Sequence, residues 1–222
     1  MKVVILTITR ILGFFVTIYI WRIFQSGQFS QLNSLIIVGG ILFVYPVVWA
    51  ARKIVDNRPA PEHLAWTTSI LHIILMILFG VSIIEAIKFF QTERGVVIPL
   101  PVELGIVLLL ITCTAAGLTV VNLALSGLGA PFAIALSRRV ANRWMYRWIR
   151  NPMVFCTIAA LLSAGIYFQS LYFILWVILF AAPSWIYFLK VYEERELEIR
   201  FGASYMEYKA KTPFLWPGKP KV

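Results

Sequence analysis

Two polar clusters flank one long apolar stretch in the C-terminal half of the chain. Residues 192–196 read YEERE and follow closely on a long, mostly apolar run, and half of the ten acidic residues lie within 193–207. At the other end of the stretch, residues 147–152 read RWIRNP. Paired carboxylates bind amines or sugar hydroxyls, and an arginine binds carboxylates. The two clusters indicate a ligand site if the fold brings them together.

A helical hairpin would bring the clusters together. With a turn near 169–170, Asn151 and Glu193 stand at similar heights on the two arms, because each residue advances a helix by 1.5 Å. Arg150 should then face Glu193 and Glu194 across the mouth of the hairpin. Such a site fits a zwitterionic ligand that carries a sugar. The alternative is that the glutamates form a solvated continuation of the last helix, supported by opposite charges three or four residues apart.

Asn151 and Pro152 predict the start of a helix. Asparagine is favoured at the N-cap, and proline is favoured at the first helical position. The positive end of this helix, with Arg150 immediately outside, would stabilise an anionic ligand group. The alternative is a plain capped helix beside an arginine that reaches the membrane interface.

Two glycines, Gly127 and Gly129, stand one residue apart in the segment SGLGAP at 126–131. Glycine permits close approach of the backbone to a ligand, and the proline that ends the segment resists continuation of a helix. The pair is a candidate ligand loop. The alternative is a simple turn that leaves the preceding apolar segment.

The composition predicts an all-α, polytopic integral membrane protein. Of the 222 residues, 60% are hydrophobic and 14% are charged, whereas about a quarter are charged in a soluble domain. A spanning helix needs about 20 mostly apolar residues. We expect six spans, the fifth of them short, at about 3–24, 34–51, 64–84, 104–125, 153–168 and 171–190. The last two form the hairpin, and a cytoplasmic tail follows.

We attribute the net charge of +10 to an interaction with the membrane surface. Anionic headgroups attract basic side chains near span ends, so the expected partner is the lipid bilayer and no nucleic acid is expected. Basic residues follow the second and fourth spans, and the positive-inside rule makes these loops cytoplasmic. They are Arg52, Lys53, Arg58, Arg138, Arg139, Arg143, Arg147 and Arg150. With six spans, both termini are predicted to be cytoplasmic.

The two histidines carry no metal signature. His63 and His72 lie far from any matching set of cysteines or histidines, so we expect no metal site. Because His72 falls within an apolar span, we interpret it as a hydrogen-bonded packing residue.

Taken together, the motifs resemble the isoprenylcysteine carboxyl methyltransferase superfamily, which includes phospholipid N-methyltransferases and small-thiol methyltransferases. The resemblance covers about residues 104–217 and rests on the order and spacing of several motifs. These are the G-x-G turn, YRWIRNPM at 146–153, the apolar hairpin, YEE at 192–194, FGASYMEY at 201–208 and TP at 212–213. The resemblance implies an integral membrane enzyme that binds S-adenosylmethionine on the cytoplasmic side and methylates a lipophilic or membrane-delivered acceptor.

Carried over residue by residue, the resemblance implies a cofactor site. Its members are Gly127, Gly129, Arg150, Asn151, Pro152, Glu193 and Glu194. An isoprenylated cysteine carboxylate, a phospholipid amine and a small thiol all stay open as acceptors. An amine must lose a proton, and Glu193, Glu194 and Tyr146 are all candidates to assist, so no catalytic residue is assigned.

A functional boundary is expected near residue 100. Residues 1–100 would form N-terminal transmembrane helices with an acceptor-binding or oligomerisation role, and 101–222 would form the methyltransferase-like membrane domain. The alternative to an enzyme is a non-enzymatic membrane protein, a small transporter or regulatory subunit that retains the scaffold. Asn151 and Val154 motivate it, because many members have histidine and tyrosine there. Transporters place ionisable groups at mid-bilayer, whereas these charges lie at span ends, which favours the enzyme. The oligomeric state stays open.

Overall fold

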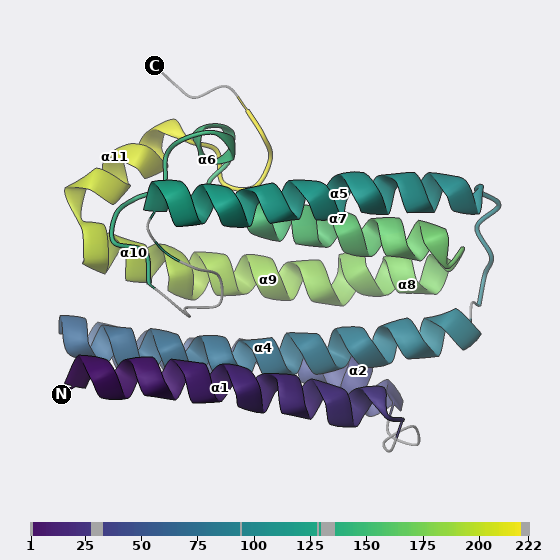
Figure 1. The fold of residues 1–222 in the computed structure, drawn as a ribbon, viewed down its shortest axis with the longest axis horizontal. Coiled ribbons are helices and arrows are strands. Elements are labelled where there is room, and N and C mark those ends of the chain that lie inside the picture. The colour runs from purple at the N-terminus through teal and green to yellow at the C-terminus, as the bar shows by residue number, and fades with distance from the viewer. Residues whose placement is uncertain (1, 28–32, 94, 128, 130–135, 219–222) are drawn as a thin grey trace.

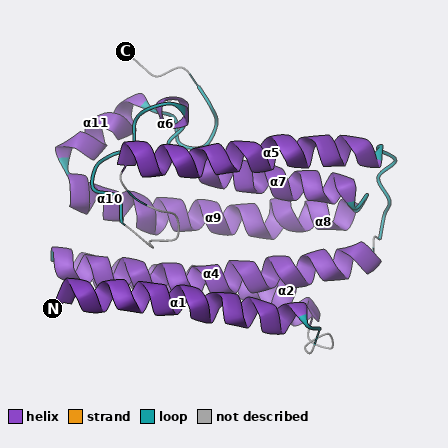
Figure 2. Ribbon diagram, viewed as in Figure 1, coloured by secondary structure: helices purple, strands orange, loops and turns teal. Residues whose placement is uncertain are grey.

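The computed structural model describes residues 2–27, 33–93, 95–127, 129 and 136–218. Every regular element in this part of the chain is a helix (Figure 2), which confirms the predicted all-α class. Extended backbone pairs there at an isolated bridge between Val97 and Ser170. The bridge ties two connecting loops together at one end of the molecule.

The long helices lie side by side in two layers (Figure 1). The first layer contains α1 (Lys2–Gln25), α2 (Asn33–Leu42), α3 (Val44–Asn57) and α4 (Pro61–Thr92). The second contains α5 (Val102–Asn122) with its π-helical extension η2 (Leu123–Gly127), then α7 (Pro152–Tyr167), and a long helix. That helix is built from α8 (Leu171–Trp176), η4 (Val177–Ala181), α9 (Ala182–Phe188), η5 (Leu189–Glu193) and α10 (Glu194–Phe201). The short helices α6 (Met145–Trp148) and α11 (Ala203–Lys211) cover one end.

Five helices of the described chain are long and apolar enough to cross a membrane. They are α1, α2 with α3, α4, α5 with η2, and the long helix from α8 to α10, with mean hydropathy between 1.9 and 2.5. The remaining predicted span corresponds to α7, which has 16 residues. It is about 24 Å long, shorter than a hydrocarbon core of roughly 30 Å. The protein is therefore a polytopic membrane protein. Its helix α7, the fifth of the expected spans, is short, as the sequence indicated.

The hairpin between α7 and the long helix turns where the sequence predicts it. Gln169 adopts a positive φ of 56°, and the Ser170 side chain accepts a hydrogen bond from the Phe173 N–H at 3.2 Å, capping α8. The two arms run antiparallel, so residues 151 and 193 return to the same end of the bundle (Figure 1).

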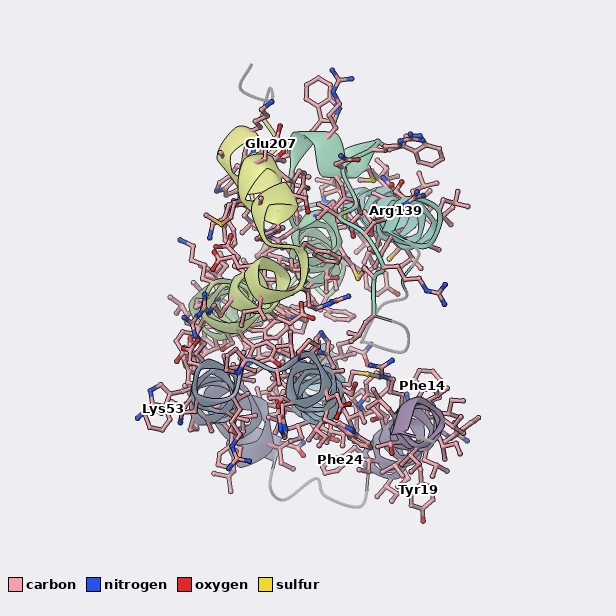
Figure 3. The ribbon with its side chains drawn as sticks, turned by 90° about the vertical axis from the view of Figure 1, so that its left-hand side faces the viewer. Phe14, Tyr19, Phe24, Lys53, Arg139 and Glu207 are labelled. Atoms are coloured by element: carbon pink, nitrogen blue, oxygen red, sulfur yellow. The ribbon has the colours of Figure 1, made fainter. Side chains whose placement is uncertain are left out.

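That end of the bundle also carries the basic loops. The connection from α3 to α4, the loop after η2, and α10 and α11 all lie there. Seen along the helices, Lys53, Arg139 and Glu207 lie on its periphery (Figure 3). The gathering of charge at one end fits the positive-inside argument, and the cytoplasmic assignment of this end and of both termini stays a prediction.

The two layers are joined where α2, α3 and α4 pack against the long helix. The Phe79 and Trp185 rings stack with centroids 4.5 Å apart, and the hydroxyls of Thr68 and Tyr192 form a buried hydrogen bond of 2.9 Å. The segment before residue 100 thus packs directly on the segment after it. By contrast, α1 lies at the edge of the bundle, and Tyr19 points away from it (Figure 3).

Candidate functional site

Arg150 lies where three segments of the chain meet. Its backbone N–H, between α6 and α7, donates to the Pro213 carbonyl at 2.9 Å. Its guanidinium donates from Nη1 to the Lys209 carbonyl at 3.0 Å, and Nη2 lies 2.8 Å from Oε1 of Glu194. The Phe214 ring centroid is 5.6 Å from the guanidinium carbon. The two polar clusters therefore meet across the hairpin mouth, as predicted.

Glu194 is the carboxylate that binds this arginine. Its Oε2 also lies 2.7 Å from Nζ of Lys209, which in turn contacts Glu198 at 2.9 Å. Burial lowers the pKa of Lys209, but hydrogen bonds to these two carboxylates raise it by more, so its pKa lies above the usual value. Oε1 of Glu194 is within ion-pair distance of Arg150 yet lacks hydrogen-bond geometry within the described residues. Glu194 thus links the hairpin to α11 through ion pairs.

Glu193 points elsewhere than Glu194. Successive residues of a helix are about 100° apart around its axis, so neighbouring glutamates cannot share one partner set. Glu193 is half-buried and lines an internal cavity. Among the described residues it makes no ion pair or hydrogen bond. A carboxylate that faces a cavity without a cationic partner is available to a ligand cation.

The cavity lies between the two layers at the polar end of the bundle and has a volume of about 320 Å³. Its polar wall comes from both halves of the chain and consists of Thr68, His72, Ser137, Tyr146, Arg150, Asn151, Thr157, Glu193, Glu196 and Arg200. Its apolar wall comes from α1, α4, α7 and α9, and includes Trp21, Met76, Phe79, Ile83, Val154 and Trp185. The space is polar where the hairpin opens and apolar toward the membrane-spanning part.

Asn151 and Pro152 start α7, as predicted, but Asn151 does not cap it. The helix begins at Pro152 with Asn151 in the N-cap position, and the asparagine makes no side-chain capping hydrogen bond. Its Nδ2 instead donates to the Phe214 carbonyl at 2.9 Å. With the Gly218 N–H bonded to the Trp148 carbonyl at 3.1 Å, this contact holds the C-terminal segment against residues 150–152, called the RNP motif after their one-letter sequence. The capping role expected for the side chain is therefore wrong: a cap would accept a helix N–H through Oδ1, whereas the bond that this amide makes is the donation from Nδ2 to the C-terminal segment.

The two motif glycines are buried beside the cavity and do not line it. A Cβ on Gly129 would come within 2.6 Å of the Ser137 Oγ and 2.8 Å of the Ser137 Cα. The Gly127 carbonyl accepts from the Arg138 N–H at 2.9 Å. The close approach that these glycines permit is thus to the chain at 137–139, and Ser137 is the residue that reaches the cavity. Pro131 of the same motif lies outside the described residues.

Three tyrosines, Tyr146, Tyr205 and Tyr208, lie near the RNP motif. The Tyr208 hydroxyl donates to the Tyr146 carbonyl at 2.7 Å, and the rings of Tyr205 and Tyr208 are 6.2 Å apart. Burial raises the pKa of each of these phenols, and the nearby Glu193 charge raises that of Tyr146 further. Tyr146 lines the cavity, where its phenol stays protonated and can donate a hydrogen bond but does not serve as a base.

The polar cavity residues of α4 were not recognised from the sequence as site candidates. Thr68 and His72 lie one helical turn apart within a mostly apolar helix, and polar side chains in a spanning helix usually face an interior cavity. That spacing was the available signal. It was missed because the prediction gave His72 a packing role and relied on the C-terminal motifs.

Comparison with protein families supplies an independent assignment. Residues 100–204 match the model of the phospholipid methyltransferase family. Comparison with curated proteins found no match, and comparison with solved structures found none. The matched range includes the G-x-G turn, the RNP motif and both hairpin glutamates, and it ends before the Thr212-Pro213 pair. The match confirms the resemblance drawn from the motifs: residues 100–204 are similar to the phospholipid methyltransferase family, which is part of the isoprenylcysteine and phospholipid methyltransferase superfamily of membrane proteins.

Proposed function

We propose that the protein is an S-adenosylmethionine-dependent methyltransferase that acts on a lipophilic or membrane-delivered acceptor. The observation that carries this proposal is the cavity between the layers, which joins the family's motif residues at its polar end to an apolar wall within the membrane-spanning helices. A family match supports methyl transfer in general. The shape and lining of the cavity support a reaction between a polar donor and an apolar acceptor.

The residues present fit the cofactor. Glu193 offers an unpaired carboxylate for its ammonium group. Arg150 lines the cavity, and its Nε is buried without a hydrogen-bond partner among the described residues, so it suits the cofactor's carboxylate. The first-turn N–H groups of α7, at Met153 and Val154 on the cavity wall, have no acceptor within the helix and add to this anion site. When bound, S-adenosylmethionine supplies an electrophilic methyl group on a sulfonium.

The remaining motif residues act through these contacts. Glu194 holds Arg150 in place, Asn151 fixes the C-terminal segment beside it, and Pro152 sets where α7 begins. Gly127 and Gly129 let the chain at Ser137 approach the cavity. We assign the whole set, as expected from the sequence, to the cofactor site, with Glu193 and Arg150 as the ligand contacts.

The N-terminal helices provide the part of the cavity wall that would bind the methyl acceptor. Residues of α1 and α4 form much of the apolar wall, which supports an acceptor-binding role for the segment 1–100. An acceptor held there would keep its apolar part among the helices and present its nucleophile to the polar end. Because positioning and exclusion of water supply much of the rate in such displacements, this arrangement suits methyl transfer.

Calorimetry with S-adenosylmethionine on the detergent-purified protein tests the proposal. Glu193→Gln should weaken binding by about 10- to 100-fold, because a charge-assisted contact is worth roughly 1.5–3 kcal/mol. Glu207→Gln, whose side chain is 72% exposed, is the matched control and should bind like the wild type. A well-folded wild-type protein that does not bind the cofactor would contradict the proposal and favour the non-enzymatic alternative.

A further inference from the structure

His72 of α4 lines the same cavity as Glu193 and Arg150. Its ring packs edge-on against Phe188, with centroids 5.4 Å apart, and its Nδ1 lies 2.8 Å from the Thr68 carbonyl oxygen. Because a carbonyl oxygen can only accept, Nδ1 carries the proton in the neutral imidazole. The other nitrogen, Nε2, then keeps a lone pair, and no donor among the described residues bonds to it. The helix backbone therefore selects one tautomer of this histidine.

A buried hydrogen bond sets where His72 lies relative to the cofactor motif. The Thr68 hydroxyl bonds to the Tyr192 hydroxyl at 2.9 Å, and Tyr192, which is 1% exposed, immediately precedes Glu193. Thr68 is one turn before His72 on α4. This bond fixes the register of α4 against η5, so the imidazole and the Glu193 carboxylate face one cavity from opposite layers.

We propose that His72 is a catalytic residue that takes the proton of an amine acceptor. The inference rests on the proposed methyltransferase function. An ammonium group has no lone pair, so it first gives a proton to Nε2 of His72. The freed nitrogen lone pair then attacks the sulfonium methyl carbon. The N–C bond forms as the C–S bond breaks, sulfur keeps the bonding pair, and His72 returns the proton to water.

The other candidate bases are paired, protonated or assigned to the cofactor. Glu194 is paired with Arg150 and Lys209. Burial raises the pKa of Tyr146, which keeps its phenol protonated. Glu193 is assigned to the cofactor ammonium. His72 combines access to the cavity with an available lone pair, and it comes from the half of the chain that forms the acceptor wall.

The variant His72→Asn distinguishes a role as proton acceptor from a structural role. The asparagine amide can still donate to the Thr68 carbonyl, but it has no imidazole lone pair. His63→Asn, at an exposed histidine near the start of the same helix, is the matched control. Methyl transfer is measured from methyl-labelled S-adenosylmethionine to vesicles of phosphatidylethanolamine and phosphatidylglycerol, with cofactor binding by calorimetry in parallel. We expect His72→Asn to lose at least about 100-fold in transfer rate with unchanged cofactor affinity, and His63→Asn to behave like the wild type.

Each contrary outcome has a distinct meaning. Full transfer by His72→Asn, or loss of cofactor binding together with transfer, would overturn the catalytic role. Wild-type protein that binds the cofactor but does not methylate the vesicles would overturn the amine chemistry and leave the proposed function standing. Wild-type protein that does not bind the cofactor would remove both.

Nitrogen NMR of the histidine side chains provides a readout independent of activity. The chain has two histidines, so His63→Asn assigns both signals. We expect the neutral His72 ring to carry its proton on Nδ1, with an unprotonated Nε2 whose resonance moves when phosphatidylethanolamine replaces phosphatidylglycerol in the vesicles. A proton on Nε2 of the neutral ring would refute the proposal.

Discussion

Adjacent glutamates at the hairpin mouth should respond to the same substitution in opposite ways. Glu194 is 13% exposed and lies 2.8 Å from Arg150 and 2.7 Å from Lys209. Glu193 has neither contact and faces the cavity. Changing either to glutamine removes one negative charge and keeps the shape. The pair is therefore a matched test of which carboxylate is structural and which is free for a ligand.

The magnitude for Glu194→Gln follows from the partners left behind. Removing one member of a buried ion pair costs about 3–5 kcal/mol, because the other charge stays buried without compensation. Lys209 is 30% exposed and keeps Glu198 at 2.9 Å, so most of the cost arises at Arg150, which is 10% exposed. We expect a loss near the lower limit, about 3 kcal/mol. For a chain of this length that lowers Tm by about 6–12 °C.

Glu193→Gln should leave Tm unchanged or raise it slightly, because the variant removes a half-buried carboxylate that has no partner within the described part of the chain. Thermal unfolding of the cofactor-free protein in detergent, followed by the fluorescence of its eight tryptophans, measures both variants, with Glu207→Gln as the exposed control. The reasoning is refuted if Glu194→Gln melts with the wild type, or if the two variants lose equal stability.

Three further changes test other parts of the site. Gly129→Ala should destabilise the protein by about 1–3 kcal/mol, since the new Cβ would lie 2.8 Å from the Ser137 Cα; an unchanged Tm would contradict the close approach. Thr68→Val should cost about 1 kcal/mol by removing the bond to Tyr192, and combination with Tyr192→Phe should cost little more, which a double-mutant cycle checks. Asn151→Ala should release the C-terminal segment, so limited proteolysis at 213–218 should accelerate; equal cleavage rates would argue against the tether.

The fold was predictable from the sequence because its signals are long and redundant. Apolar segments of about 20 residues specify membrane helices almost regardless of their neighbours. The turn at 169–170 and the start at Pro152 follow from local chemistry, and helix rise then places Arg150 at the level of the two glutamates. The length of α7 was less decisive, and it was already the shortest of the expected spans.

The partners of individual side chains were not predictable in the same way. Glu193 and Glu194 are equivalent as sequence, and only the direction of each on the helix assigns one to Arg150 and the other to the cavity. Asn151 has the residue type of a helix cap, yet a carbonyl 63 residues away in the chain takes its amide hydrogen. Such choices depend on tertiary contacts, which a local pattern does not encode.

The position of His72 on the cavity wall could not be predicted from its own span. A single histidine in an apolar helix is usually a packing residue, and that interpretation used no information from the second layer. The cavity lies between α4 and the long helix, which are bonded to each other through Thr68 and Tyr192. Polar residues one turn apart on a spanning helix are therefore worth pairing with motifs elsewhere in the chain.

A structure of the protein with S-adenosylhomocysteine, the product form of the cofactor, tests the central claim most directly. We predict that the ligand occupies the cavity between the layers, with its ammonium group in hydrogen-bond contact with Glu193 and its carboxylate at Arg150 and the first turn of α7. A ligand bound outside this cavity, or one whose amino acid part contacts neither residue, would contradict the account.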